Sequence, residues 1–221
     1  WFAVMYLKGN GHVIKEFIDY QIRLFNTEDS DHGGPFIYHF VVLLLGCFPS
    51  SLFLILAHKK STSDTPYQLH SKRWMMSLFW VVLILFSIVQ TKIVHYSSLC
   101  YFPLTYLATY AIQKLMAAQY NWKKAFHLFF VIISTLLGLA FLLIGCLPIL
   151  KPWLVTSNVI ADPFAVENLK ANVHWSGYEW IIGIVFLGIT HFSLAKIKTG
   201  AFKYIYLVFL GSLFSVYSLI M

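Results

Sequence analysis

The stretch FHLFFVIISTLLGLAFLLIGCLPI, residues 126–149, contains no Asp, Glu, Lys or Arg. A helix that crosses the hydrocarbon core of a bilayer needs about 20 consecutive apolar residues, so this stretch predicts a transmembrane helix. The whole chain agrees, because 59% of its residues are hydrophobic, only 11% are charged and its mean hydropathy is +0.71. A soluble domain averages about 25% charged residues, which excludes a soluble enzyme and a disordered region.

We therefore expect an all-α fold, a polytopic transmembrane helical bundle of about six spans. The expected spans are residues 36–57, 74–90, 94–113, 126–149, 179–195 and 203–221. The second and fifth are short, at about 17 residues, near the lower limit for a helix that spans. The third carries many hydroxyl and imidazole groups, so we expect it to face protein or a cavity and not lipid.

Charge predicts the orientation of the spans. Ten basic residues and one acid lie on the three loops 58–73, 114–125 and 196–203. Six basic residues and eight acids lie on the opposite side of the expected spans. Because short cytoplasmic loops are enriched in Lys and Arg, residues 1–35 and 150–178 are expected outside the cytoplasm. The net charge of +7 is thus a topology signal, and without a basic stripe no nucleic-acid partner is expected.

The first 35 residues are expected to form an outer segment ahead of the bundle, which spans 36–221. Within it, apolar residues recur at helical spacing over 11–25, with charged residues on the other face. This pattern predicts an amphipathic helix that lies in the membrane interface. The first residue is Trp and there is no signal-peptide pattern, so we interpret the chain as a fragment that begins within a longer protein.

Ionisable and aromatic side chains gather at the outer ends of the expected spans. They are Asp31, His32, Tyr38 and His39 at the first span, Lys92, His95 and Tyr96 between the second and third, and Arg23 on the interfacial helix. Such groups usually face a cavity or a partner at membrane depth. Arg and Lys beside tyrosines suit a phosphate-bearing ligand with a lipid tail, because Arg offers a planar fork and Lys a compact charge.

Each candidate also has a plain structural explanation. The ammonium of Lys92 could extend into water at the outer interface, Arg23 could belong to a solvated helix face, and Asp31 could bond local backbone amides. The tyrosines could form an aromatic belt, and the histidines could be hydrogen-bonded core residues.

Metal and haem sites are weakly indicated. No close ligand pair such as H-x-x-x-H occurs, so no metal-binding residue is assigned, although a divalent metal ion stays open as a cofactor. His127 and His191 fall at similar depths on different spans, which is the pattern of haem ligation in a b-type cytochrome subunit.

Several motifs occur in a recognisable order over the first 107 residues. Asp31-His32-Gly33-Gly34-Pro35-Phe36-Ile37-Tyr38 precedes Leu43-Leu44-Leu45-Gly46-Cys47-Phe48-Pro49, and Phe86-Ser87-Ile88-Val89-Gln90-Thr91-Lys92 follows. This part resembles the second half of bacterial membrane glycosyltransferases of the protein-O-mannosyltransferase (GT-C) superfamily, in the branch that contains the aminoarabinose transferase of lipid A. There an H-x-x-P-F-x-Y element opens a span that reads L-L-x-G-x-x-P.

The resemblance implies an inner-membrane transferase that uses a polyprenyl-phosphate-linked sugar as donor. It would transfer the sugar on the outer face to a lipid or protein hydroxyl. Lys92 matches a lysine in a later element of the family, which follows the end of a span, and it would lie near the donor phosphate. Arg23 is the second candidate for contact with that phosphate. Tyr38 and His32 match the H-x-x-P-F-x-Y element at the mouth of the first span. The family's acidic catalytic residues lie in an earlier loop, so no catalytic residue is expected in this chain.

Three positions depart from the family pattern. Gln21 and Leu24 replace a His and an Arg at the end of the interfacial helix, with Arg23 one step earlier, and Val94 replaces the proline after the family lysine. A transporter or flippase for lipid-linked or amphipathic solutes is the alternative function, since a polar third span and short spans are compatible with it.

Overall fold

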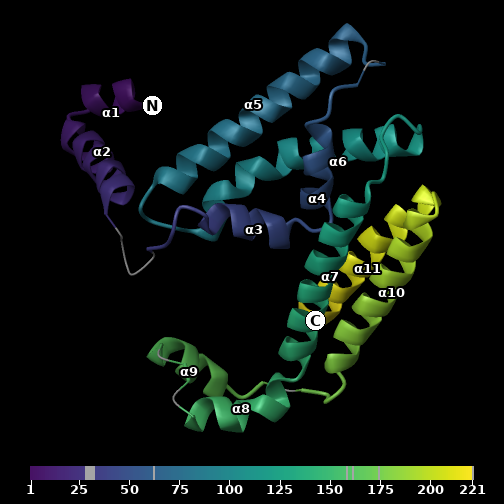
Figure 1. Ribbon diagram of the computed structural model, residues 1–221. Helices are drawn as coiled ribbons and strands as arrows, with labels where there is room; N and C mark the ends of the chain where they lie inside the picture. The colour runs from purple at the N-terminus through teal and green to yellow at the C-terminus, as the bar shows by residue number, and fades with distance from the viewer. Residues whose placement is uncertain (28–32, 62, 158, 161, 174, 221) are drawn as a thin grey trace. The chain divides into compact units, whose positions relative to one another are not determined.

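The computed structural model describes residues 1–27, 33–61, 63–157, 159–160, 162–173 and 175–220. Every regular element in these ranges is a helix (Figure 1). The chain divides into two compact units, Trp1–Gln113 and Lys114–Met221. The predicted all-α, polytopic helical fold is confirmed, and each unit is considered by itself below.

Four helices of the described chain are long and apolar enough to cross a membrane by themselves. They are α5 (Pro66–Ile88), α7 (Lys124–Gly145), α10 (Trp180–Lys198) and the continuous run of η2 (Phe202–Tyr204) and α11 (Ile205–Ile220). A fifth crossing is formed if the bent pair α3 (Tyr38–Gly46) and α4 (Ser50–Ala57) counts as one span.

The first unit opens with two surface helices, α1 (Phe2–Leu7) and α2 (Gly11–Asn26). Helix α2 coincides with the predicted amphipathic helix. Its apolar residues Phe17, Ile18, Ile22 and Phe25 are each 43–55% exposed, whereas Leu24 is buried. An exposed apolar face of this kind fits a helix in the membrane interface, and that location remains a prediction.

The first expected span is broken, because α3 and α4 meet at an angle of 110°. The break falls at Gly46–Pro49, inside the L-L-L-G-C-F-P motif. Proline has no backbone N–H to continue the hydrogen-bond ladder. The Ser51 hydroxyl donates to the carbonyl of Leu44 at 2.6 Å, which satisfies a backbone group that the break releases.

The second expected span starts earlier than its apolar residues indicate. Thr65 forms a capping box with Gln68, in which the backbone N–H of Gln68 donates to Oγ1 of Thr65 at 3.2 Å and the N–H of Thr65 donates to Oε1 of Gln68 at 3.1 Å. Helix α5 therefore begins at Pro66 and has 23 residues. The third expected span divides into the 3-10 helix η1 (Val94–Cys100) and α6 (Tyr101–Met116).

The second unit is built on three helices that run side by side, α7, α10 and α11 (Figure 1). Glycines set their close approach: a Cβ atom added to Gly183 of α10 would lie 2.5 Å from the backbone nitrogen of Leu142 in α7, and one added to Gly211 of α11 would lie 2.8 Å from Ile189. Small residues at contacts are the usual means by which membrane helices pack closely. The predicted outer loop contains two short helices, α8 (Leu147–Thr156) and α9 (Pro163–Lys170).

Replacing Gly183 with leucine tests this packing. The larger side chain would push α10 away from the backbone of α7, and we expect a loss of about 1–3 kcal/mol of stability, as for other overpacked cores. The midpoint of thermal unfolding in detergent measures the loss. Gly188→Leu on the same helix is the matched control, because nothing lies within 4 Å of a Cβ atom there. Equal midpoints for the two variants would contradict close glycine packing.

Candidate functional site

The start of α3, the end of α5 and the 3-10 helix η1 meet in the first unit. Tyr38 is the first residue of α3, Phe86 lies in the last turn of α5, and His95 and Tyr96 belong to η1. Lys92 lies in the segment between α5 and η1. Four of the residues that the sequence singles out, Tyr38, Lys92, His95 and Tyr96, thus come from the elements that meet here.

Lys92 is buried, with only 5% of its surface exposed. Its ammonium donates to the carbonyl oxygens of Ser87 at 2.7 Å, of Phe86 at 3.4 Å and of Val89. The last carbonyl groups of a helix have no partner within the helix, so Lys92 caps the C-terminus of α5. Its ammonium therefore does not extend into water. Burial lowers the pKa of this ammonium.

The side chain of Lys92 lies against the entry to α3. A Cβ atom added to Gly34 would lie 3.0 Å from Cγ of Lys92 and 3.7 Å from Cδ2 of Tyr38. On the other side, the ring of Phe86 packs against Tyr96 with centroids 5.4 Å apart, and Tyr96 against His95 at 5.3 Å. A side chain at position 34 would be tight against Lys92, whose side chain would have to shift by a few tenths of an ångström.

His39 adds an unpaired polar group to the same cluster. It is fully buried, and neither ring nitrogen has a hydrogen-bond partner among the described residues. Its ring packs edge-on against Tyr38 at 5.1 Å and lies 6.5 Å from Phe86. A buried polar group without a partner is rare and costly. The sequence offered a hydrogen-bonded core histidine as one explanation, and within the described residues that explanation is wrong.

Arg23 lies in the last turn of α2, and hydrogen bonds connect the end of α2 to this region. The backbone N–H of Gln90 donates to the carbonyl of Phe25 at 3.1 Å, and the hydroxyl of Thr91 donates to the carbonyl of Thr27 at 2.8 Å. The guanidinium of Arg23 lies 5.1 Å from the centroid of the Tyr20 ring, and the residue is exposed. The structure therefore places the helix end that carries Arg23 next to the segment that carries Lys92.

Asp31 and His32 lie outside the described residues, and their predicted part in the site is untested. Among the residues that the structure describes, no group of three His, Cys, Asp or Glu side chains can hold a metal ion. The two inner histidines take part in local hydrogen bonds: His191 pairs with the hydroxyl of Thr135 at 3.1 Å and the carbonyl of Leu187 at 2.9 Å, and His127 accepts from Trp122 at 3.2 Å. These bonds favour a packing role over the haem hypothesis.

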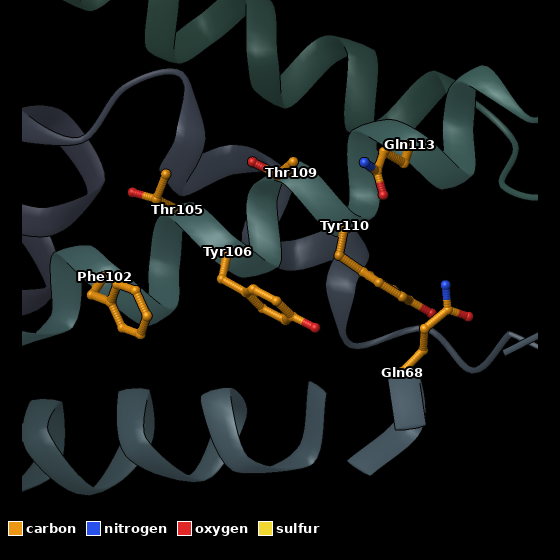
Figure 2. Close-up of a pocket in the computed structure, with 7 residues that line it drawn as sticks. All are labelled: Gln68, Phe102, Thr105, Tyr106, Thr109, Tyr110 and Gln113. Atoms are coloured by element: carbon orange, nitrogen blue, oxygen red, sulfur yellow. The ribbon is translucent and has the colours of Figure 1, made fainter. Parts of the chain in front are cut away.

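One face of α6, rich in hydroxyl and aromatic side chains, lines a cavity of about 380 Å³. Its lining residues on α6 recur every three or four positions, and they are Phe102, Thr105, Tyr106, Thr109, Tyr110 and Gln113. In Figure 2 the rings of Tyr106 and Tyr110 point from α6 to the side where Gln68 of α5 lies. The cavity is consistent with the expectation that this segment faces protein or a cavity, and its position relative to lipid stays a prediction. Its helical periodicity is visible in the sequence, although we assigned none of these residues to a site.

The opposite face of α6 is apolar and buried. Leu104, Leu107, Ala108, Ala111 and Leu115 are each at most 2% exposed. The sequence predicts that α6 lies at membrane depth, where polar side chains usually face a cavity. Its hydroxyl-rich face is therefore the face expected to line one.

Comparison with known proteins gives a partial match. The chain is 31% identical, over 109 residues, to an undecaprenyl phosphate-alpha-4-amino-4-deoxy-L-arabinose arabinosyl transferase of Wigglesworthia glossinidia brevipalpis. The match covers 45% of this chain and 18% of that transferase, so the chain spans less than a fifth of the length of this relative. No family model matches the chain, and neither does any solved structure.

Lys92→Met removes the charge and the donors of Lys92 while it keeps a long side chain against Gly34. The carbonyls of Ser87 and Val89 would then lose a buried donor, and we expect a loss of about 2–3 kcal/mol of stability. The midpoint of thermal unfolding in detergent is the readout. Lys15→Met, at an exposed lysine of α2, should change stability by less than about 0.5 kcal/mol. An unchanged midpoint for Lys92→Met would contradict the capping role.

Proposed function

We propose that this chain is part of an integral-membrane glycosyltransferase that takes its sugar from a polyprenyl-phosphate-linked donor. The single observation that carries the proposal is the 31% identity to a transferase whose name states an undecaprenyl phosphate donor. The structure adds that Tyr38 and Lys92, 54 positions apart in the sequence, both lie beside Gly34, as residues of one site would. The acceptor would be a lipid or protein hydroxyl group.

In the proposed reaction the acceptor oxygen forms a bond to the anomeric carbon of the sugar. The bond between that carbon and the phosphate oxygen breaks, and its electron pair leaves with the polyprenyl phosphate. The acceptor proton passes to a general base, which we place outside this chain. A cation near the leaving phosphate would stabilise the developing charge, and Lys92 is our first candidate for it, with Arg23 second.

The donor phosphate would compete with helix carbonyls for Lys92. The ammonium already donates to α5, yet its neighbours include the unpaired ring of His39 and the phenol of Tyr38. A phosphate that enters here would give His39 a partner, provided the ring donates a proton to it. We therefore place the donor phosphate between the start of α3 and η1, with His95 and Tyr96 toward the sugar.

The proposed location is the bacterial inner membrane, with residues 1–35 and 150–178 on the extracytoplasmic side. Its support is the asymmetry of charge, with ten basic residues on the loops of the opposite side. The C-terminal end of α5, which Lys92 caps, would then lie at the outer surface, where a lipid-linked sugar is accessible.

One observation favours the alternative of a transporter or flippase. The bent pair α3–α4 is a discontinuous helix, and such helices form the substrate sites of many transporters. Those transporter folds are usually built from internal repeats. The two units of this chain differ in the order of their elements, because the bent pair α3–α4 of the first unit has no counterpart among the described residues of the second.

Lys92→Met in membranes that contain the full protein tests the proposed function. We expect transfer of sugar from a polyprenyl phosphate donor to fall by about 100-fold or more in kcat. The assay is run below the unfolding midpoint of the variant, so that lost stability does not lower the rate.

Lys15→Met serves as the control and should transfer sugar like the unaltered protein. A Lys92→Met protein with unaltered kcat would remove Lys92 from the mechanism. Movement of the lipid-linked sugar across the membrane without a new glycosidic bond would replace the transferase proposal with the transporter alternative.

A further inference from the structure

A second pocket, of about 420 Å³, lies between the end of α4 and the first turns of α5. Its wall on α5 is a single helix face, made by Leu69, Lys72, Arg73 and Met76. The segment after α4 supplies His58 and Lys60. The volume is within the usual range for sites that bind small ligands.

The back of this pocket is held in place by buried hydrogen bonds. Lys72 is only 8% exposed, and its ammonium donates to the carbonyl of Lys59 at 2.6 Å and lies 4.6 Å from the centroid of the Tyr110 ring. The Tyr110 hydroxyl donates to Oδ2 of Asp64 at 2.6 Å. These contacts connect the loop, α5 and α6, so the pocket has a defined wall.

The pocket carries an excess of positive charge. Lys60, Lys72 and Arg73 line it with Asp64 as the one acid among the described lining residues. Lys60 and Arg73 are exposed, and within the described part of the chain no hydrogen bond or ion pair engages either head group. Two cations at the mouth of a cavity are therefore available to an anionic ligand.

The pocket lies where α5 passes from polar to apolar sequence. The apolar stretch begins at residue 74, directly after Arg73. Trp74 is 65% exposed and Tyr67 is 80% exposed, and such aromatic residues are enriched at membrane–water interfaces. Leu69 and Met76 give the pocket an apolar lining on the same side as its cations.

We propose that this pocket binds the phosphate of an anionic phospholipid. Arg73 and Lys60 donate to the phosphate oxygens, and the acyl chains follow Leu69 and Met76 along α5. The planar fork of Arg suits phosphate, and basic pockets between transmembrane helices are known to hold lipid head groups. Dissolved phosphate shares the head-group chemistry but makes no use of the apolar wall. The site lies at the opposite end of α5 from Lys92, so this proposal does not depend on glycosyl transfer.

The test uses purified protein in a neutral detergent, titrated with phosphatidylglycerol while the midpoint of thermal unfolding is measured. A ligand that binds only the folded state raises that midpoint, and the rise grows with the logarithm of its concentration relative to its Kd. Native mass spectrometry counts the phosphatidylglycerol molecules that stay bound. Lys60→Gln with Arg73→Gln should weaken the affinity by about tenfold or more, because charged hydrogen bonds to the phosphate are lost.

The matched control replaces two other exposed basic residues on the same predicted side of the membrane, Lys123→Gln with Lys124→Gln. This double variant should retain the affinity of the unaltered protein for phosphatidylglycerol. Phosphatidylcholine, which has no net charge, should leave the unfolding midpoint of the unaltered protein unchanged. An equal loss of affinity in both double variants would overturn the proposal, because binding would then follow net charge alone. An equal rise with inorganic phosphate would also overturn it, since the ligand would then be a soluble anion.

Discussion

The buried ammonium of Lys92 is the interaction on which the candidate site depends. The last carbonyl groups of α5 would lack partners near the membrane surface, where unpaired backbone groups are costly. Lys92 donates to them and is itself satisfied by them, as a buried charge must be. Lys92 thus caps the end of α5 just before η1 begins, although Val94 stands where relatives of the resembled family have proline. This exchange also presses the Lys92 side chain against Gly34, which brings the entry to α3 to the same place.

The sequence predicted the helical class, the longest spans and the amphipathic helix α2, because apolar length and 3.6-residue periodicity are local properties of the chain. It did not predict the break between α3 and α4. Residues 36–57 are almost continuously apolar, and only Gly46 and Pro49 mark the bend. The start of α5 was also missed, since its first turns are polar. The Thr65–Gln68 capping box was the signal that could have located it.

The site was predicted in part. Tyr38, Lys92, His95 and Tyr96 were singled out by residue type and by resemblance, and the structure brings the elements that carry them together. The ammonium of Lys92 turns back onto carbonyls three to six residues earlier, which depends on the backbone conformation after α5. The burial of the His39 ring without a described partner depends on tertiary packing. Residue spacing in the sequence shows neither. The hydroxyl-rich face of α6, in contrast, could have been predicted, because its residues recur every three or four positions in the sequence.

We propose a polar donor site at one end of α5 and a basic lipid site at the other. In the donor site, the phosphate of the polyprenyl-linked sugar would lie beside Lys92. Photo-crosslinking tests this placement, with a polyprenyl phosphate that carries a photoreactive group next to its phosphate and with the labelled peptides identified by mass spectrometry. We expect labels within residues 33–39 and 92–96. Labels confined to residues 58–76, or spread evenly over the membrane helices, would contradict this placement.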